Sequence, residues 1–257
     1  MTNIYGKAWD DYVRQQFPNS AARRNRKLAY PGDEWGTDRF WNATFEQLFL
    51  KHGAAAWRRA VEIGPGAGKY TERALAAAPE LELMGFDVSQ AFIDVCAARL
   101  APYGKRLELR LLDGRVPHEM LDALDERGWS GTIDAFFAID VLVHIDLQVT
   151  IAYLLTAAAS LRQGGLLIAT FADPTSTEGF DKLLADIKPF FGKVGEPSAK
   201  FEYVDRSIVE TILQRIGFHI RYCGNWLPKR DGEGRDLYVV AELQDVARAR
   251  FLAHHLR

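Results

Sequence analysis

The sequence predicts an α/β protein built on a largely parallel sheet with helices on both faces. Three observations lead to this fold class. From residue 59 onward, short β-like segments alternate with segments of helical period, which is typical of βαβ units. A glycine-rich turn, VEIGPGAGKYT at residues 61–71, follows the first apolar segment, and acidic residues stand at the ends of the next ones. Ligands of such sheets bind beyond the carboxyl ends of the strands.

The first five strands are expected where short apolar runs occur, and helices are expected between them. Ser89 is a suitable N-cap for the second helix because its hydroxyl can accept a backbone N–H. Glycines 164 and 165 are expected to close the fourth helix. The expected strands are 59–64, 81–87, 106–113, 133–140 and 166–173, and the expected helices are 69–80, 89–104, 117–128 and 146–165.

The alternation breaks after Pro174. Residues 174–204 are predicted to be an insertion with one helix, followed by a helix over 205–217. Two further strands, 218–225 and 236–243, flank a turn-rich segment and predict an antiparallel hairpin at the sheet edge. Residues 1–58 are predicted to be mostly helical and to form a cap or lid, so that 59–257 is the main domain.

Composition excludes several classes of protein. The 257 residues are 48% hydrophobic and carry a net charge of −2, so no overall charge favours nucleic acid or an anionic membrane. The basic stretch at residues 23–27 is interpreted as a solvated segment. Cys96 and Cys223 lack metal-ligand spacing. No apolar run approaches the ~18–20 residues of a membrane span, so we expect a cytoplasmic protein, with a homodimer possible.

The glycine-rich turn admits three nucleotide-binding interpretations. A P-loop requires glycine where this chain has Ile63, and serine or threonine where it has Tyr70. The dinucleotide fingerprint requires glycine or alanine at position 69, which is lysine. The remaining pattern is Glu62 followed by glycines at 64, 66 and 68.

This pattern resembles motif I of the class I S-adenosylmethionine-dependent methyltransferases, and the resemblance covers residues 59–173. Asp87, beside Val88, ends the second strand, where a carboxylate can accept both ribose hydroxyls of an adenosine. The resemblance implies a Rossmann-like, seven-stranded sheet with a C-terminal antiparallel hairpin. It also implies S-adenosylmethionine as methyl donor and S-adenosylhomocysteine as product. The implied donor-binding residues are Glu62, Gly64, Gly66, Gly68, Asp87, Val88, Asp113, Gly114 and Asp140.

A second resemblance concerns the segment before the first strand. Residues 24–41, RNRKLAYPGDEWGTDRFW, with AWDDYV at 8–13 and IDVLVHID at 139–146, are similar to a bacterial methyltransferase subgroup associated with surface polysaccharides and glycans. This resemblance implies a cap that closes over the donor, with Glu34 near it and Trp35 in contact with it. The alternative is a surface loop whose aromatic side chains pack on the core.

Methyl transfer to a hydroxyl requires a general base, and histidine suits that role near neutral pH. His144 lies four residues after Asp140, just beyond a predicted strand end, and Asp173 ends the fifth strand. His144 and Asp173 are therefore the candidate catalytic residues, although a histidine packed at a helix start is the alternative. No adjacent pair of metal-binding side chains follows the fifth strand, so no metal is expected. Phe180, Phe190, Phe191 and Tyr203 of the insertion, and residues 222–236, are candidate walls of the acceptor site.

The predicted function is methyl transfer to a hydroxyl of a sugar, a glycan or another small molecule, without a nucleic-acid partner or a membrane span. Within the same fold, the alternative is an N-methyltransferase or a natural-product methyltransferase. From other classes, the alternatives are an NAD-dependent oxidoreductase and a non-catalytic cofactor-binding domain.

Overall fold

Seven strands and the helices around them make up the computed structural model, which describes all residues except 1–3, 113–115, 192–200, 226–232 and 257. The chain divides into two compact units, residues 1–114 with 197–199, and residues 115–196 with 200–257. We describe each unit in turn. The strands run in the order β3-β2-β1-β4-β5-β7-β6.

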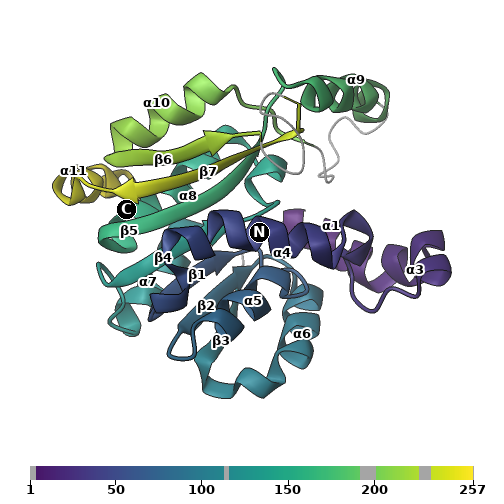
Figure 1. The fold of residues 1–257 in the computed structure, drawn as a ribbon, viewed down its shortest axis with the longest axis horizontal. Coiled ribbons are helices and arrows are strands. Elements are labelled where there is room, and N and C mark those ends of the chain that lie inside the picture. The colour runs from purple at the N-terminus through teal and green to yellow at the C-terminus, as the bar shows by residue number, and fades with distance from the viewer. Residues whose placement is uncertain (1–3, 113–115, 192–200, 226–232, 257) are drawn as a thin grey trace. The chain divides into compact units, whose positions relative to one another are not determined.

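The first unit contains three parallel strands, and most residues of the first two are buried. β1 (Arg59–Ile63) pairs with β2 (Glu82–Asp87), which pairs with β3 (Leu107–Leu111). The connecting helices are α5 (Lys69–Ala77) and α6 (Gln90–Arg99), and a 3-10 segment, η5 (Ala101–Arg106), leads into β3 (Figure 1). Ser89 accepts the N–H of Phe92 and caps α6, as predicted.

The segment before β1 is mostly helical, as predicted, and belongs to the same unit. Its buried residues include Phe45, Leu48 and Phe49, and the Phe49 ring stacks on Tyr70 of α5. Its elements are α1 (Ile4–Asp11), the π-helical turn η1 (Tyr12–Gln16), α2 (Phe17–Asn19), α3 (Ala21–Arg26), η2 (Asp33–Trp35), α4 (Asp38–Leu48), η3 (Leu50–His52) and η4 (Ala54–Ala56).

The second unit contains the other four strands. β4 (Ile133–Ala138) runs parallel to β5 (Leu161–Ala172), whereas β7 (Asp236–Leu243) runs antiparallel to both β5 and β6 (Phe218–Gly224). The helices are α7 (Val116–Glu126), η6 (Leu142–His144), α8 (Leu147–Ser160), α9 (Thr177–Phe191), α10 (Arg206–Ile216), α11 (Val246–Leu252) and η7 (Ala253–Leu256).

The structure confirms the predicted fold class, a seven-stranded sheet that is parallel except for its antiparallel C-terminal strand, with β7 and β6 at the end of the strand order. Two helix ends differ from the prediction. α6 ends at Arg99 rather than at residue 104, and the 3-10 segment η5 follows it. α8 ends at Ser160 rather than at the glycines, and β5 begins at Leu161. Leu161 is already extended and pairs with Ile133, so strand pairing prevails over the helical sequence pattern.

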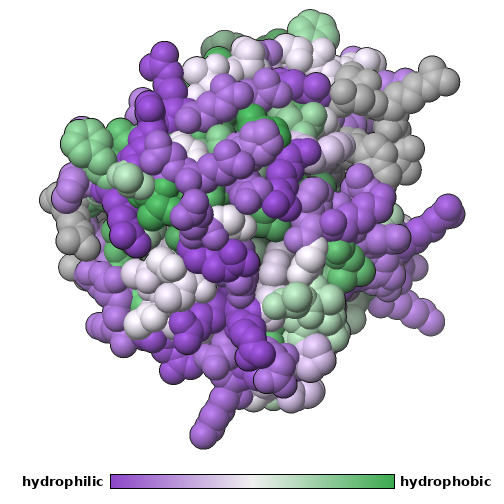
Figure 2. Space-filling model, turned by 60° about the vertical axis from the view of Figure 1, so that its left-hand side comes forward, coloured by the Kyte–Doolittle hydropathy of each residue, from purple (hydrophilic) through white to green (hydrophobic). Residues whose placement is uncertain are grey.

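The described part of the chain has no helix that is long and apolar enough to cross a membrane. On the face that Figure 2 shows, hydrophobic residues form scattered areas among hydrophilic ones. Several exposed hydrophobic side chains lie on α9, including Phe180, Leu184 and Ile187.

Candidate functional site

The glycine loop between β1 and α5 has the conformation that its spacing predicts. Gly64, Gly66 and Gly68 have φ angles of 62°, 55° and 80°, a region that residues with a Cβ rarely adopt. A Cβ on Gly68 would approach Leu100 to 2.8 Å, but a Cβ on Gly66 would meet nothing closer than Phe92 at 3.8 Å. Gly68 therefore allows α6 to pack closely, whereas a Cβ at Gly66 would make only ordinary van der Waals contact with Phe92.

Glu62 lies at the base of this loop and is almost completely buried, at 3% exposure. Thr71 of α5 donates its hydroxyl to Glu62 Oε2 at 2.5 Å. Burial raises the pKa of Glu62 to about 8, although the hydrogen bond from Thr71 acts in the opposite direction. Glu62 thus links β1 to α5 and favours its protonated form near neutral pH.

We expect the stability of the unliganded protein to fall as pH rises from 6 to 8, because the folded state keeps a Glu62 proton that the unfolded state has already released. The pKa of Glu62 rises from an ordinary value of 4.5 to about 8 on folding, so the folded protein binds the extra proton in this interval. The expected loss is roughly 2–3 kcal/mol. Denaturant unfolding at pH 6, 7 and 8 measures it, and Glu62→Gln should flatten the slope. The exposed acid variant Glu80→Gln is the control; equal slopes in all three proteins would contradict the assignment.

Asp87 ends β2 and holds the loop from the other side. Its Oδ2 accepts the N–H of Gly66 at 3.2 Å, and its Oδ1 accepts the N–H of Ser89 at 2.9 Å. Burial raises the pKa of Asp87 to about 6, while these backbone N–H groups lower it. Each carboxylate oxygen retains a further lone pair, so Asp87 is equipped to accept hydroxyls of a bound ligand. The predicted neighbour, Val88, is half-buried beside it.

The two donor-binding residues predicted after β3, Asp113 and Gly114, lie outside the described residues. Their predicted contact with the donor stays a prediction.

An acid of the N-terminal segment completes the start of α6. Asp10 of α1 accepts the Ser89 hydroxyl at 2.6 Å and the Ala91 N–H at 3.0 Å with the same oxygen. A carboxylate at a helix N-terminus is stabilised by the exposed N–H groups there. Asp10 therefore ties α1 to the end of β2, next to Asp87.

The PGDEWG segment, residues 31–36, is held by the lysine that begins α5. Lys69 Nζ lies 3.7 Å from Asp33 and 4.1 Å from the centroid of the Trp41 ring. Lys69 is the first residue of α5, at the predicted start of that helix. The loop lysine thus joins the N-terminal segment to the glycine loop.

An aromatic cluster, made of Trp9, Tyr12, Trp35 and Phe92, lies over the same region. Tyr12 stacks on Trp35 with ring centroids 5.3 Å apart, and Trp9 meets Trp35 edge-on at 6.1 Å. Both Trp9 and Tyr12 lie 6.1 Å from Phe92. Trp35 nevertheless remains 55% exposed, so it has surface left for a ligand, and its predicted contact with the donor stays a prediction.

In the second unit, Asp140 follows β4 in a strained backbone conformation. Its φ is 57°, which is uncommon for a residue other than glycine. The Thr170 hydroxyl accepts the Asp140 N–H at 2.8 Å, and the half-exposed carboxylate lies 3.7 Å from Arg235. Such strain collects at functional sites, which supports the prediction that Asp140 has a role there.

His144 closes the short helix η6 after β4 and belongs to a cluster around Phe201. The His144 and Phe201 rings meet edge-on, with centroids 4.9 Å apart. Lys182 and Arg235 lie 4.7 Å and 4.6 Å from the centroid of the same Phe201 ring. Asp140, through Arg235, is joined to this Phe201 cluster. The second unit therefore brings His144 and Asp140 to one aromatic, polar cluster.

Asp173 does not join this cluster through any contact of its carboxylate. It is buried, with Oδ1 accepting the N–H and hydroxyl of Thr175 and Oδ2 accepting the Asn225 side-chain amide at 3.0 Å. These contacts shape the turn into α9. The predicted catalytic role of Asp173 stays a prediction.

The predicted acceptor walls are only partly described. Phe180 and Phe191 are 52% and 72% exposed, and Tyr203 donates its hydroxyl to Asp186 at 3.1 Å. The Phe190 side chain and residues 226–232 lie outside the described part of the chain.

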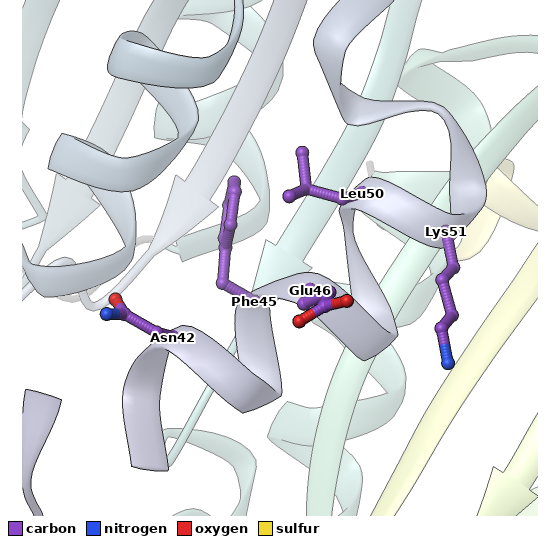
Figure 3. Close-up of a pocket in the computed structure, with 5 residues that line it drawn as sticks. All are labelled: Asn42, Phe45, Glu46, Leu50 and Lys51. Carbon is purple, nitrogen blue, oxygen red and sulfur yellow. The ribbon is translucent and has the colours of Figure 1, made fainter. Parts of the chain in front are cut away.

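A hollow lined by residues of α4 and η3 is formed by other residues. Figure 3 shows its lining of Asn42, Phe45, Glu46, Leu50 and Lys51. None of these belongs to the glycine loop or to the predicted acids. Within the described ranges, no group of three or more His, Cys, Asp or Glu is placed to hold a metal ion.

Several contributors to the two clusters are absent from the sequence-based prediction. Asp10 and Tyr12 lie in the AWDDYV segment, which carries a signal only through its resemblance to a subgroup. Phe201 and Arg235 lie within the predicted insertion and within residues 222–236, but the sequence did not single out either residue. Their positions depend on long-range packing.

Comparison with known proteins agrees with this geometry. Residues 61–167 match a family model described as a methyltransferase domain. No curated protein matched the chain.

Among solved structures, the chain is similar to magnesium protoporphyrin IX methyltransferase from Synechocystis PCC 6803 with bound S-adenosylhomocysteine. The identity is 17% and the TM-score 0.63, covering 94% of this chain and 100% of that one. The chain is also similar to a methyltransferase from Anabaena variabilis, with 16% identity and a TM-score of 0.61, covering 95% of this chain and 96% of that one. Its identity to geranyl diphosphate C-methyltransferase from Streptomyces coelicolor is 13%, with a TM-score of 0.61, covering 93% of this chain and 96% of that one. Residues 61–167 are therefore similar to a methyltransferase domain, and the chain shares the fold of S-adenosylmethionine-dependent methyltransferases.

Proposed function

We propose that this protein is an S-adenosylmethionine-dependent methyltransferase that methylates a hydroxyl of a sugar or another small molecule. The observation that carries the donor assignment is the glycine loop, in which the Gly66 N–H donates a hydrogen bond to Asp87. When bound, S-adenosylmethionine supplies a methyl carbon activated by a positively charged sulfur.

The first unit fits the donor in three respects. Asp87 has lone pairs for the ribose hydroxyls, and the glycine loop leaves space at Gly66 for a tail that approaches the backbone. Trp35 offers an exposed aromatic face. Glu62 accepts the Thr71 hydroxyl and so stabilises the base of the loop. These features support donor binding at the carboxyl ends of β1 and β2.

The second unit supplies groups suited to a hydroxyl acceptor. We infer that His144 removes the proton from the acceptor hydroxyl and that Asp140 and Arg235 orient the acceptor. The Phe201 ring, next to these polar groups, resembles the combination of aromatic face and polar rim that suits a sugar. Solved relatives include a C-methyltransferase, so the choice of oxygen rests on His144 and not on the comparisons.

Methyl transfer from S-adenosylmethionine to a panel of nucleotide sugars, glycan fragments and amines tests the proposal by mass spectrometry. We expect an O-methylated sugar product. With that acceptor, His144→Ala should lower kcat by about 10²–10⁴-fold, which is the usual contribution of a general base. It should also remove the rise in rate over roughly pH 6–7, where histidines titrate.

The exposed histidine variant His219→Ala is the matched control and should retain the wild-type rate. An N-methylated product whose formation His144→Ala leaves intact would contradict the hydroxyl acceptor.

A further inference from the structure

Glu34 carries a polar atom that the protein itself does not satisfy. Its Oε2 is buried and has no hydrogen-bond partner in the described part of the chain. Its Oε1 accepts the hydroxyl of Tyr12. Leaving a carboxylate oxygen buried without a donor is costly, so such an atom marks a place where a ligand donor would be stabilised.

Glu34 is fixed next to the glycine loop from two directions. On one side, its neighbour Asp33 pairs with Lys69, and a Cβ on Gly32 would come within 3.0 Å of Lys69 Nζ. On the other side, the ring of its partner Tyr12 lies 6.1 Å from the ring of Phe92, the residue nearest to a Cβ placed on Gly66. The orphaned oxygen therefore belongs to the same part of the first unit as the loop.

The local backbone is built to hold this carboxylate. The Tyr12 hydroxyl accepts the Gly32 N–H at 2.9 Å while it donates to Glu34. Arg26 donates to the carbonyl oxygen of Glu34 at 3.1 Å. Tyr12 also begins a π-helical turn, Tyr12–Gln16, a rare conformation that is frequent at functional sites. Tyr12 is thus a positioning residue for Glu34.

Four groups of the donor could meet a carboxylate: the sulfonium, the ribose hydroxyls, the adenine amino group, which has N–H groups but no charge, and the ammonium. The sulfonium has a positive charge but no N–H or O–H, so it cannot satisfy an orphaned acceptor. The ribose hydroxyls match Asp87, which ends the neighbouring strand. The ammonium group of the amino-acid tail has both the charge and the hydrogen atoms that Oε2 lacks.

We propose that Glu34 Oε2 accepts a hydrogen bond from the ammonium group of the methyl donor, so that the N-terminal segment itself forms part of the donor site. This inference rests on the proposed function. It assigns the ammonium to Glu34, whose Oε2 has no partner in the described part of the chain, rather than to Glu62, one of the donor-binding acids that the resemblance implies, whose Oε2 already accepts the Thr71 hydroxyl at 2.5 Å.

Calorimetric titration with two ligands tests the assignment. One ligand is S-adenosylhomocysteine, and the other is its deaminated analogue, which keeps the adenosine and the carboxylate. Glu34→Gln is the informative variant, because the amide retains an oxygen for Tyr12 but loses the charge and the second acceptor. We expect Glu34→Gln to weaken the binding of S-adenosylhomocysteine by about 10–100-fold. The affinity for the deaminated analogue should not change. Glu46→Gln, an exposed acid on α4, should alter neither affinity.

Two results would overturn the inference while the proposed function stands: an unchanged affinity of Glu34→Gln for S-adenosylhomocysteine, or an equal loss for both ligands, which would indicate a disturbed cap. If the wild-type chain binds neither ligand, the proposed function fails and this inference fails with it. Tryptophan fluorescence gives an independent readout, since Trp35 and Trp9 lie in the aromatic cluster with Tyr12.

Discussion

Asp87→Asn is expected to weaken binding of S-adenosylhomocysteine by at least about 100-fold. Two ribose hydroxyls would lose charge-assisted hydrogen bonds, each worth roughly 1.5–3 kcal/mol. The loop is also affected, because the two Asp87 oxygens accept the Gly66 and Ser89 N–H groups. The amide of asparagine has only one oxygen, so one of these backbone donors would face an N–H group instead.

Calorimetry measures this loss, and circular dichroism checks that the variant is folded. Asp94→Asn is the control, because Asp94 is an exposed acid on α6 whose carboxylate accepts the Gln90 side chain at 2.8 Å. A folded Asp87→Asn protein with wild-type affinity would show that the adenosine does not bind at the end of β2.

A pair of glycine substitutions separates ligand binding from packing. Gly68→Ala should destabilise the protein by about 2–4 kcal/mol, because it combines a φ of 80° with a Cβ only 2.8 Å from Leu100. Gly66→Ala has space for its Cβ, so its cost should be limited to about 1–2 kcal/mol of backbone strain. Its methyl group would, however, stand where the donor approaches the backbone.

We therefore expect Gly66→Ala to reduce donor affinity by more than tenfold while its melting temperature stays the closer of the two to wild type. Thermal unfolding and calorimetry on both variants measure the two effects. The reverse pattern, with Gly68→Ala binding worse and Gly66→Ala melting lower, would contradict the assignment of the open side of the loop.

The order of strands and helices could be predicted because it is encoded locally. Apolar runs such as RAVEI and ELMGFD form β1 and β2 at the expected places, and the spacing of the loop glycines matches three positive φ angles. The C-terminal boundary of α8 could not be predicted, since the pairing of Leu161 with Ile133 decides it and no local signal marks that pairing.

The surroundings of the candidate site were less accessible to sequence reasoning. Asp10 reaches Ser89 across 79 positions, and Tyr12 reaches Glu34 across 22. Neither separation leaves a periodic trace, so only folding reveals that the N-terminal segment supplies polar partners to the end of β2. Asp173 illustrates the converse. Its position after a strand suggested catalysis. In the structure its oxygens accept hydrogen bonds from Thr175 and Asn225, which no sequence pattern indicates.

The central claim is that the loop at residues 61–71 binds a methyl donor rather than a dinucleotide. Calorimetric titration of the full chain with S-adenosylmethionine and, separately, with NAD tests this most directly. The account predicts saturable, one-to-one binding of S-adenosylmethionine and no measurable heat with NAD. Tight binding of NAD without binding of S-adenosylmethionine would contradict it.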